Sequence, residues 1–424
     1  MAVAFSTFLI KSHVKFYADD TSLFSIVREP NISAMELNHD LSLISRWAYQ
    51  WKMSFNPDPN KQAVQIIFSR KKNKQFHPNI YFNNIEVKTV DNHKHIGLIL
   101  DSKLTFASHI LDKISAARRG LGIIKCLARF LSVKDLNMIF KMYIRPHLDF
   151  CDVIYHKPAL TNPFDSSINL NYLMNTLERI QYQAALAITG TWKGTNLNKI
   201  YDELGWESLT DRRWSRRLFQ FYKIQNNLTP PYLRDPIPPS RTHLFGQRSG
   251  NILHDIRHNT NRYGDSFYPD SVDCWNKVGP ELRNSPSLLS FKQNILALIR
   301  PSAKSIFNIY NPIAIKWLYQ LRVGLSPLFY HKHKHNFNDI PSDKCLVCNQ
   351  PENCEHFFLY CTRFAEARRI FFSKLTDINL SFANLQSKDR VKLFLYGDMT
   401  LNQNTNKILL EATLNFLVDS KRFL

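Results

Sequence analysis

Two adjacent aspartates, Asp19 and Asp20, lie at a bend between two short apolar segments near the start of the sequence. Apolar Val14 and Phe16 lead into the bend, and apolar Leu23 and Phe24 follow it, a pattern that predicts a strand, a tight turn and a second strand. Neighbouring carboxylates supply the hard oxygen ligands that Mg²⁺ prefers. We therefore predict an acidic hairpin that contributes ligands to a divalent cation, as in two-metal nucleotidyl transfer.

The charge of the chain points to a polyanionic partner. The 424 residues include 55 Lys and Arg against 35 Asp and Glu, a formal net charge of +20. Such an excess favours nucleic acid over membrane, with a merely soluble basic protein as the alternative. No apolar stretch approaches the 18 residues of a membrane span. Seven cysteines in a chain of this length argue against a secreted disulfide scaffold and favour an intracellular location.

A second candidate metal site comes late in the sequence. Cys345-x2-Cys348-x7-His356-x4-Cys361 has the spacing of a tetrahedral Zn²⁺ site, in which the first two thiolates come from one turn. Cys354 could replace His356 or stay unligated, and buried thiols without a metal are the alternative for the whole group. The run His331–His335 predicts a hydrated basic loop, and a second metal site is the less favoured alternative.

The N-terminal hundred residues predict a mixed unit. Ser33-x-x-Glu36 has the form of a capping box, and apolar residues at helical spacing follow it to Trp51. Asn83-Asn84 tolerates a left-handed turn and predicts a hairpin of 80–82 with 85–87. Further strands are expected at 64–68 and 96–100. This order predicts an antiparallel sheet with a helix on one face.

The remainder predicts helices. Amphipathic segments run over 107–131 and 171–188, and a helix capped by Ser132-x-x-Asp135 is expected to stop at Pro146. Another spans 211–224. Residues 229–270, rich in Pro, Arg, His and Asn, predict a linker or extended loop. Later helices are expected at 271–275, 287–300, 313–323, 363–375, 388–395 and 406–423. Basic side chains that could face phosphate include Arg118, Arg119, Arg212 and Arg213.

Taken together, these stretches resemble the reverse transcriptases of non-LTR retrotransposons, of the jockey-like kind. The matching residues are Val14–Leu23, Trp47-x3-Trp51-x3-Phe55-Asn56-Pro57 with Lys61, and His95–Asp101. Towards the end, Leu321-Arg322-x-Gly324-Leu325 and the cysteine–histidine segment are similar to the C-terminal region of the same elements. Residues 145–320 show only a general similarity to these elements, without a matching motif.

The resemblance implies roles for several residues. Asp19 would bind catalytic Mg²⁺ or Mn²⁺, Asp20 would support it, and Lys61 would protonate the leaving pyrophosphate. Tyr17 and the primer grip around Gly97 would contact the nucleic acid. The cysteine–histidine cluster would help to engage element RNA or target DNA. RNA template and DNA primer are thus the expected partners, in a cytoplasmic ribonucleoprotein and in the nucleus.

In that family the fingers and the first catalytic aspartate precede the acidic hairpin, which here lies near residue 1. The sequence is therefore expected to be a C-terminal fragment of an RNA-directed DNA polymerase, inactive without the missing N-terminal half. Asp101 resembles an upstream metal aspartate only superficially. The alternative function is a basic nucleic-acid-binding protein without catalysis.

The expected fold is α+β. A truncated palm would span 1–104, a helical thumb 105–228, a linker 229–270, and a C-terminal helical region 271–424 with a zinc-knuckle-like module at 345–361.

Overall fold

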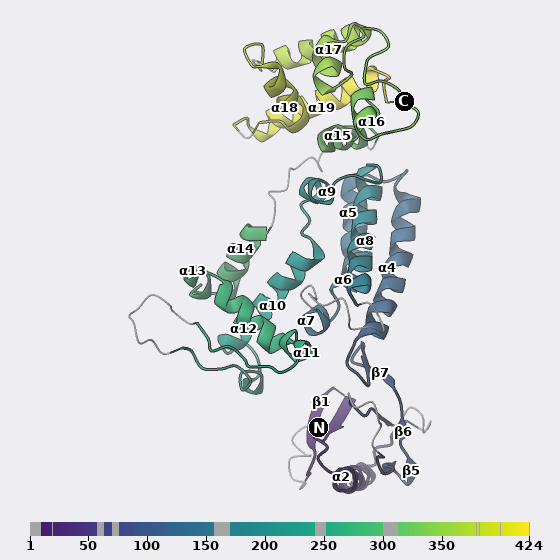
Figure 1. The fold of residues 1–424 in the computed structure, drawn as a ribbon, viewed down its shortest axis with the longest axis vertical. Coiled ribbons are helices and arrows are strands. Elements are labelled where there is room, and N and C mark those ends of the chain that lie inside the picture. Colours follow the sequence, from purple (N-terminus) through teal and green to yellow (C-terminus); the bar gives the residue numbers. More distant parts are fainter. Residues whose placement is uncertain are drawn as a thin grey trace. The chain divides into compact units, whose positions relative to one another are not determined.

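The structure is a computed structural model that describes residues 10–18, 20–56, 63–69, 76–156, 170–241, 252–299, 313–378, 380, 382–398 and 400–423. The chain forms two compact units, Met1–Ile110 and Leu111–Leu424. The first combines short strands with one long helix, and the second is helical (Figure 1). This mixture of helices and small sheets is compatible with the predicted α+β class.

The hairpin predicted at the start of the chain is present. Strand β1 (His13–Tyr17) pairs antiparallel with β2 (Asp20–Phe24), and Tyr17 lies opposite Asp20. Only two residues connect the strands, and Ala18 takes a positive φ of 52°. Primed hairpin turns require such left-handed backbone because it matches the twist of the strands. Asp19 lies outside the described residues.

Helix α2 (Pro30–Gln50) starts earlier than predicted, because Pro30 rather than a capping box opens it. Proline suits the first helical turn, where its missing N–H has no partner in any case. Glu29 is the N-cap and no side chain caps the helix, so the predicted role of Ser33 and Glu36 is wrong. One face of α2 buries Trp47 in a core with residues from the strands that follow. The fully buried members of that core are Ile44, Trp47, Ala48, Ile80, Phe82 and Val87.

The described strands of this unit pair two by two and do not form the single antiparallel sheet that we expected. β4 (Tyr81–Phe82) and β5 (Ile85–Glu86) form the predicted hairpin, with both Asn83 and Asn84 at positive φ. β3 (Val64–Gln65) pairs parallel with β6 (Lys88–Thr89). β7 (Asn92–His95) and β8 (Leu98–Asp101) form a third hairpin, whose turn includes Gly97 at φ 81°. Each of these pairings spans only two to five residues.

The second unit begins as a helical bundle. Its long helices are α4 (Ala107–Leu127) and α8 (Leu170–Thr189), and the shorter α5 (Val133–Ile139) accompanies them (Figure 1). The Ser132 hydroxyl accepts a hydrogen bond from the Asp135 N–H, which confirms the predicted cap. The predicted stop at Pro146 is wrong. After α5, a π-helical turn η1 (Phe140–Ile144) leads into α6 (Arg145–Asp149), where Pro146 occupies the first turn.

A second group of helices packs on α10 (Leu209–Gln225). α7 (Asp152–Tyr155) and α9 (Leu197–Leu204) precede α10, and the elements after it are η2 (Pro231–Leu233), α11 (Asn261–Gly264), α12 (Phe267–Lys277), α13 (Pro280–Arg283) and α14 (Leu288–Ile299). Leu253, in the predicted linker, is buried in the core formed by α10, α12 and α14. The predicted linker thus contributes Leu253 to this core, while most of its residues from 229 to 241 are exposed.

The C-terminal helices surround an aromatic core. They are α15 (Ala314–Val323), α16 (Phe329–Lys334), η3 (His356–Tyr360), η4 (Thr362–Phe364), α17 (Ala365–Asp377), α18 (Ser387–Tyr396) and α19 (Gln403–Asp419). The buried phenylalanines are Phe357, Phe358, Phe364, Phe371, Phe394 and Phe416. α15 joins this group to the bundle, since Arg322 forms a buried ion pair with Glu203 of α9. None of the helices described here combines the length and the apolar character needed to cross a bilayer.

Candidate metal centre

A short hairpin places the first two cysteines of the predicted zinc site. Lys344 and Pro351 pair as an isolated antiparallel bridge, and the Cys345 N–H donates to the Gln350 carbonyl at 2.7 Å. Asn349 turns the chain at φ 54°, a left-handed conformation that asparagine tolerates better than most residues. The Cys345 and Cys348 thiols therefore come from one tight turn, as the CxxC spacing predicted.

A π-helical turn places the other two ligands. His356 begins η3, and the Cys361 N–H donates to the His356 carbonyl at 2.8 Å. In a regular α-helix, residues five apart are separated by about 500° of rotation and so face different sides. The wider i→i+5 turn brings them back towards one side, and π-turns of this kind are frequent at functional sites. The x4 spacing between His356 and Cys361 thus fits the local backbone.

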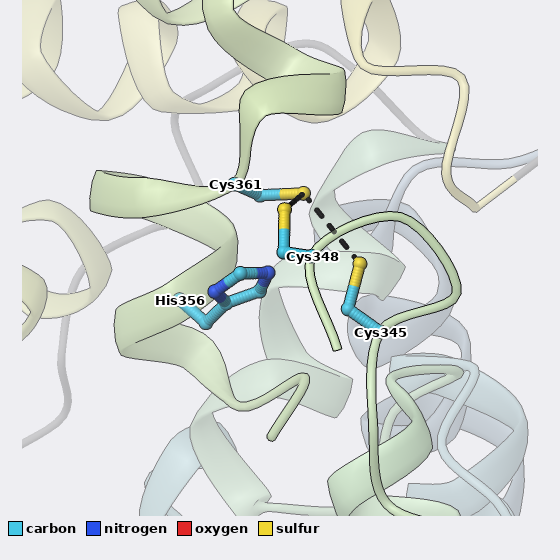
Figure 2. A group of neighbouring side chains, drawn as sticks. All are labelled: Cys345, Cys348, His356 and Cys361. Atoms are coloured by element: carbon cyan, nitrogen blue, oxygen red, sulfur yellow. Dashed lines mark hydrogen bonds between the residues drawn. The ribbon is translucent and has the colours of Figure 1, made fainter. Parts of the chain in front are cut away.

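The four side chains converge on one point (Figure 2). Cys361 Sγ lies 3.8 Å from both Cys345 Sγ and Cys348 Sγ. Candidate ligand atoms of all four residues lie within 4.8 Å of one another. In a tetrahedral zinc site with Zn–S bonds of about 2.3 Å, the sulfurs stand about 3.8 Å apart. The observed separations are therefore those of a site that can hold a metal ion such as zinc.

The chemistry of the donors supports the same conclusion. His356 is buried, and its Nε2 has no hydrogen-bond partner, although buried polar atoms normally have one. Burial lowers the pKa of His356, which favours the neutral imidazole that binds metals. Burial raises the pKa of the Cys361 thiol to about 12, so a metal ion must displace its proton. A cation at this point would satisfy the imidazole nitrogen and stabilise the thiolates.

Cys354, the spare cysteine of the segment, lies apart from this group. Its Sγ is 3.9 Å from His331 Nε2, and His331 Nδ1 is 2.8 Å from the Ser326 hydroxyl. His331 is buried on α16, so the predicted hydrated basic loop is wrong at this residue. The geometry therefore selects His356 over Cys354 as the fourth member of the cluster.

An ion pair fixes the hairpin to the C-terminal end of the chain. The spacing of the cysteines and the histidine did not predict it. Glu352 is buried and accepts hydrogen bonds from Arg422 Nε at 2.7 Å and Nη2 at 2.6 Å. Its Oε2 also accepts the Phe329 N–H at 2.9 Å, which ties α16 to the same carboxylate. A bidentate arginine–carboxylate pair is geometrically specific. The cluster is thus built on a hairpin anchored from two sides.

The acidic hairpin of the first unit presents a more open arrangement. Tyr17 is 63% exposed and Asp20 is also exposed. The Ser22 hydroxyl lies 3.3 Å from His95 Nε2, which places β2 beside the β7–β8 hairpin that contains the predicted primer grip. Burial lowers the pKa of His93, with His95 adding to the effect and Asp20 opposing it. Asp19 and Lys61 lie outside the described residues.

Asp101 has a structural role in the loop before α4. Its carboxylate accepts the backbone N–H groups of Lys103, Thr105 and Phe106, the last at 2.7 Å. Three backbone donors fix the side chain in this loop, in the manner of a helix cap. Among the described residues, the Cys345 cluster is the one group of three or more metal-binding side chains close enough to share an ion.

The four arginines singled out as phosphate contacts lie in two different settings. Arg118 and Arg119 are exposed on α4. Arg212 donates from Nε and Nη2 to the Asp149 carboxylate at 2.8 and 2.7 Å. Arg213 is only 3% exposed. Arg213 therefore does not lie on a solvated face: its Nη1 is 3.3 Å from Met174 Sδ, and its guanidinium lies over the Tyr155 ring.

Comparison with protein-family models, with curated proteins and with solved structures finds no match to this chain.

Proposed function

We propose that Cys345, Cys348, His356 and Cys361 bind one Zn²⁺ ion, and that this ion is structural. The observation that carries the proposal is the pair of 3.8 Å sulfur separations beside the unpartnered Nε2 of His356. Structural zinc sites use four protein ligands, whereas catalytic ones leave a position for water. Here four protein ligands are already gathered, and two of the thiols are buried. The ion would lock the hairpin onto η3 and the aromatic core.

The experiment is a stoichiometry measurement on purified full-length chain. One equivalent of zinc by elemental analysis, with an X-ray absorption spectrum that fits three sulfurs and one nitrogen, is the expected result. A Cys361→Ser variant should lose the metal, and a Cys354→Ser variant should keep it. Retention by Cys361→Ser, or loss by Cys354→Ser, would contradict the assigned ligand set.

We further propose that the chain is part of an RNA-directed DNA polymerase of the retroelement kind and binds a primer–template through basic side chains. The hairpin register supports this reading, since it sets exposed Tyr17 opposite exposed Asp20. Exposed Arg118 and Arg119 can contact phosphate, and the net charge of +20 favours a polyanion. The resemblance of 14–104 to non-LTR reverse transcriptases supplies the reaction class.

Catalytic Mg²⁺ or Mn²⁺ is proposed at Asp19 and Asp20. Such an ion requires near-octahedral oxygen coordination, and nucleotidyl transfer uses two of them. Asp101 is already bonded to three backbone N–H groups, so it is a poor candidate for a further ligand. We therefore expect the chain by itself to bind primer–template without extending the primer, which is the alternative, non-catalytic function.

Primer extension on a homopolymer RNA template, with Mg²⁺ or Mn²⁺, separates the two functions. The proposed outcome is salt-sensitive binding without synthesis, equal in the wild type and in Asp19→Ala. Synthesis that vanishes in Asp19→Ala would show that the chain completes its own metal site. Weak binding that is insensitive to salt would reject the nucleic-acid proposal altogether, because phosphate contacts release counterions. Arg118→Gln and Arg119→Gln should each reduce the salt dependence, and exposed Arg369→Gln serves as the control.

A further inference from the structure

A zinc ion held by three thiolates and one neutral imidazole leaves a net charge of −1 on the centre. Cys345 and Cys361 are both buried, and Cys361 is fully so. A buried net charge is costly unless an opposite charge or hydrogen-bond donors stand near it. The proposed zinc site therefore calls for a cation beside its sulfurs, and this inference rests on that proposed site.

Arg368, on α17, lies in the position that such a cation requires. Its Nη2 donates to the Cys361 carbonyl at 2.8 Å. Its Nη1 is buried and has no hydrogen-bond partner. Burial lowers the pKa of its guanidinium, and the Cys361 and Cys348 sulfurs oppose that effect. An arginine held next to a ligand by one nitrogen, with a second buried nitrogen unpartnered, has one donor left for a sulfur.

We propose that Arg368 is a positioning residue of the metal centre, which donates from Nη1 to a zinc-bound thiolate and offsets the negative charge of the site. Hydrogen bonds to metal-bound ligands commonly change metal affinity by about 10- to 100-fold. An N–H donor would also draw electron density from the sulfur, which raises the energy of the thiolate-to-metal charge-transfer transition. Both effects need the charge and the donor, and not merely the volume, of the side chain.

The chain offers a matched control in the adjacent residue. Arg369 occupies the next position of the same helix, is exposed, and pairs with Glu366 through hydrogen bonds of 3.0 and 2.7 Å. Arg369→Gln removes one positive charge, as Arg368→Gln does, from a neighbouring position on the helix. A difference between Arg368→Gln and Arg369→Gln thus reports contact with the centre and not general electrostatics.

The first experiment is competition for zinc between the full chain and a chromophoric chelator, at fixed pH and ionic strength. We expect Arg368→Gln to weaken zinc binding by about 10- to 100-fold, Arg368→Lys to weaken it less, and Arg369→Gln to leave it unchanged. Equal affinities for Arg368→Gln and Arg369→Gln would overturn the proposal while leaving the zinc site intact. Wild-type chain that binds no zinc would instead overturn the site itself.

The second experiment separates an effect on the sulfurs from a merely structural one. Cobalt replaces zinc, and the thiolate-to-cobalt charge-transfer band is recorded for each variant. Loss of the charged guanidinium donor should move this band to lower energy in Arg368→Gln and not in Arg369→Gln. Thermal unfolding of the metal-free proteins completes the comparison. An unmoved band, together with an affinity loss matched by an equal loss of metal-free stability, would assign Arg368 to helix packing alone and overturn the proposal.

Discussion

The buried ion pair between Arg322 and Glu203 gives the sharpest test of how the second unit is assembled. Arg322 Nη1 lies 2.9 Å from Glu203 Oε2, and the two side chains are 0% and 5% exposed. Arg322 Nε also donates to the Leu395 carbonyl at 2.6 Å, so one guanidinium joins α15 to α9 and α18. Removal of one partner of a buried pair typically costs about 3–5 kcal/mol, because the remaining charge stays buried without its counterion.

We therefore expect Arg322→Met to lower the stability of the α15 region by about 3–5 kcal/mol, and Glu203→Gln by a similar amount. The double variant should lose less than the sum, with a coupling energy on the order of 2 kcal/mol, since neither charge is then left alone. The two-unit chain need not unfold in one step, so native-state hydrogen exchange of α15 amides is the suitable assay. Single losses below about 1 kcal/mol, or strict additivity in the double variant, would refute the reasoning.

Four further changes have defined outcomes. Removal of zinc by a chelator should lower the melting temperature of the wild type but not of Cys361→Ser, and an equal shift in both would argue against a structural ion. Burial lowers the pKa of His156 to about 3, below its usual 6.5, so its contribution to stability is complete above pH 6.5 and is lost as the pH falls from 6.5 towards 3. His156→Gln should therefore reduce the pH dependence of the unfolding free energy in this range by at most about 5 kcal/mol, measured by denaturant titration across pH. Asp101→Ala should cost about 1–2 kcal/mol, as for a lost helix cap, in the hydrogen exchange of α4. Gly324→Ala should cost about 1 kcal/mol in the exchange of α15, because residue 324 has a φ of 76°, and no loss would show that the turn relaxes freely.

Local signals in the sequence predicted local structure well. The turn at Asn83-Asn84, the cap at Ser132 and the helix over 171–188 are all present within a residue or two. Each depends on preferences that act over a few neighbouring residues, such as tolerance of left-handed backbone or a hydroxyl that accepts a nearby N–H. The spacing of the four metal ligands belongs to the same class, because a CxxC turn and a short helical turn largely fix where those side chains point.

Features that depend on distant partners were missed. The sequence suggested that Arg212 and Arg213 could face phosphate, yet Arg212 binds Asp149, sixty-three residues away, and Arg213 is buried. The run His331–His335 was predicted to be a loop, yet His331 is buried on a helix and contacts Ser326. The sequence around an arginine or a histidine does not show whether water or a carboxylate surrounds its side chain in the folded protein. Charge and periodicity therefore could not distinguish these two environments.

The sequence by itself determined the acidic hairpin, most of the helices and the three cysteine ligands of the metal cluster, because each is set by chemistry within about 20 residues. Only the tertiary structure decided that Cys354 pairs with His331 and that His356 completes the cluster instead. It also decided that Asp101 serves a loop, and that Arg368 donates to the Cys361 carbonyl. These outcomes depend on which helices pack together, and packing brings together side chains whose separation along the chain carries no signal.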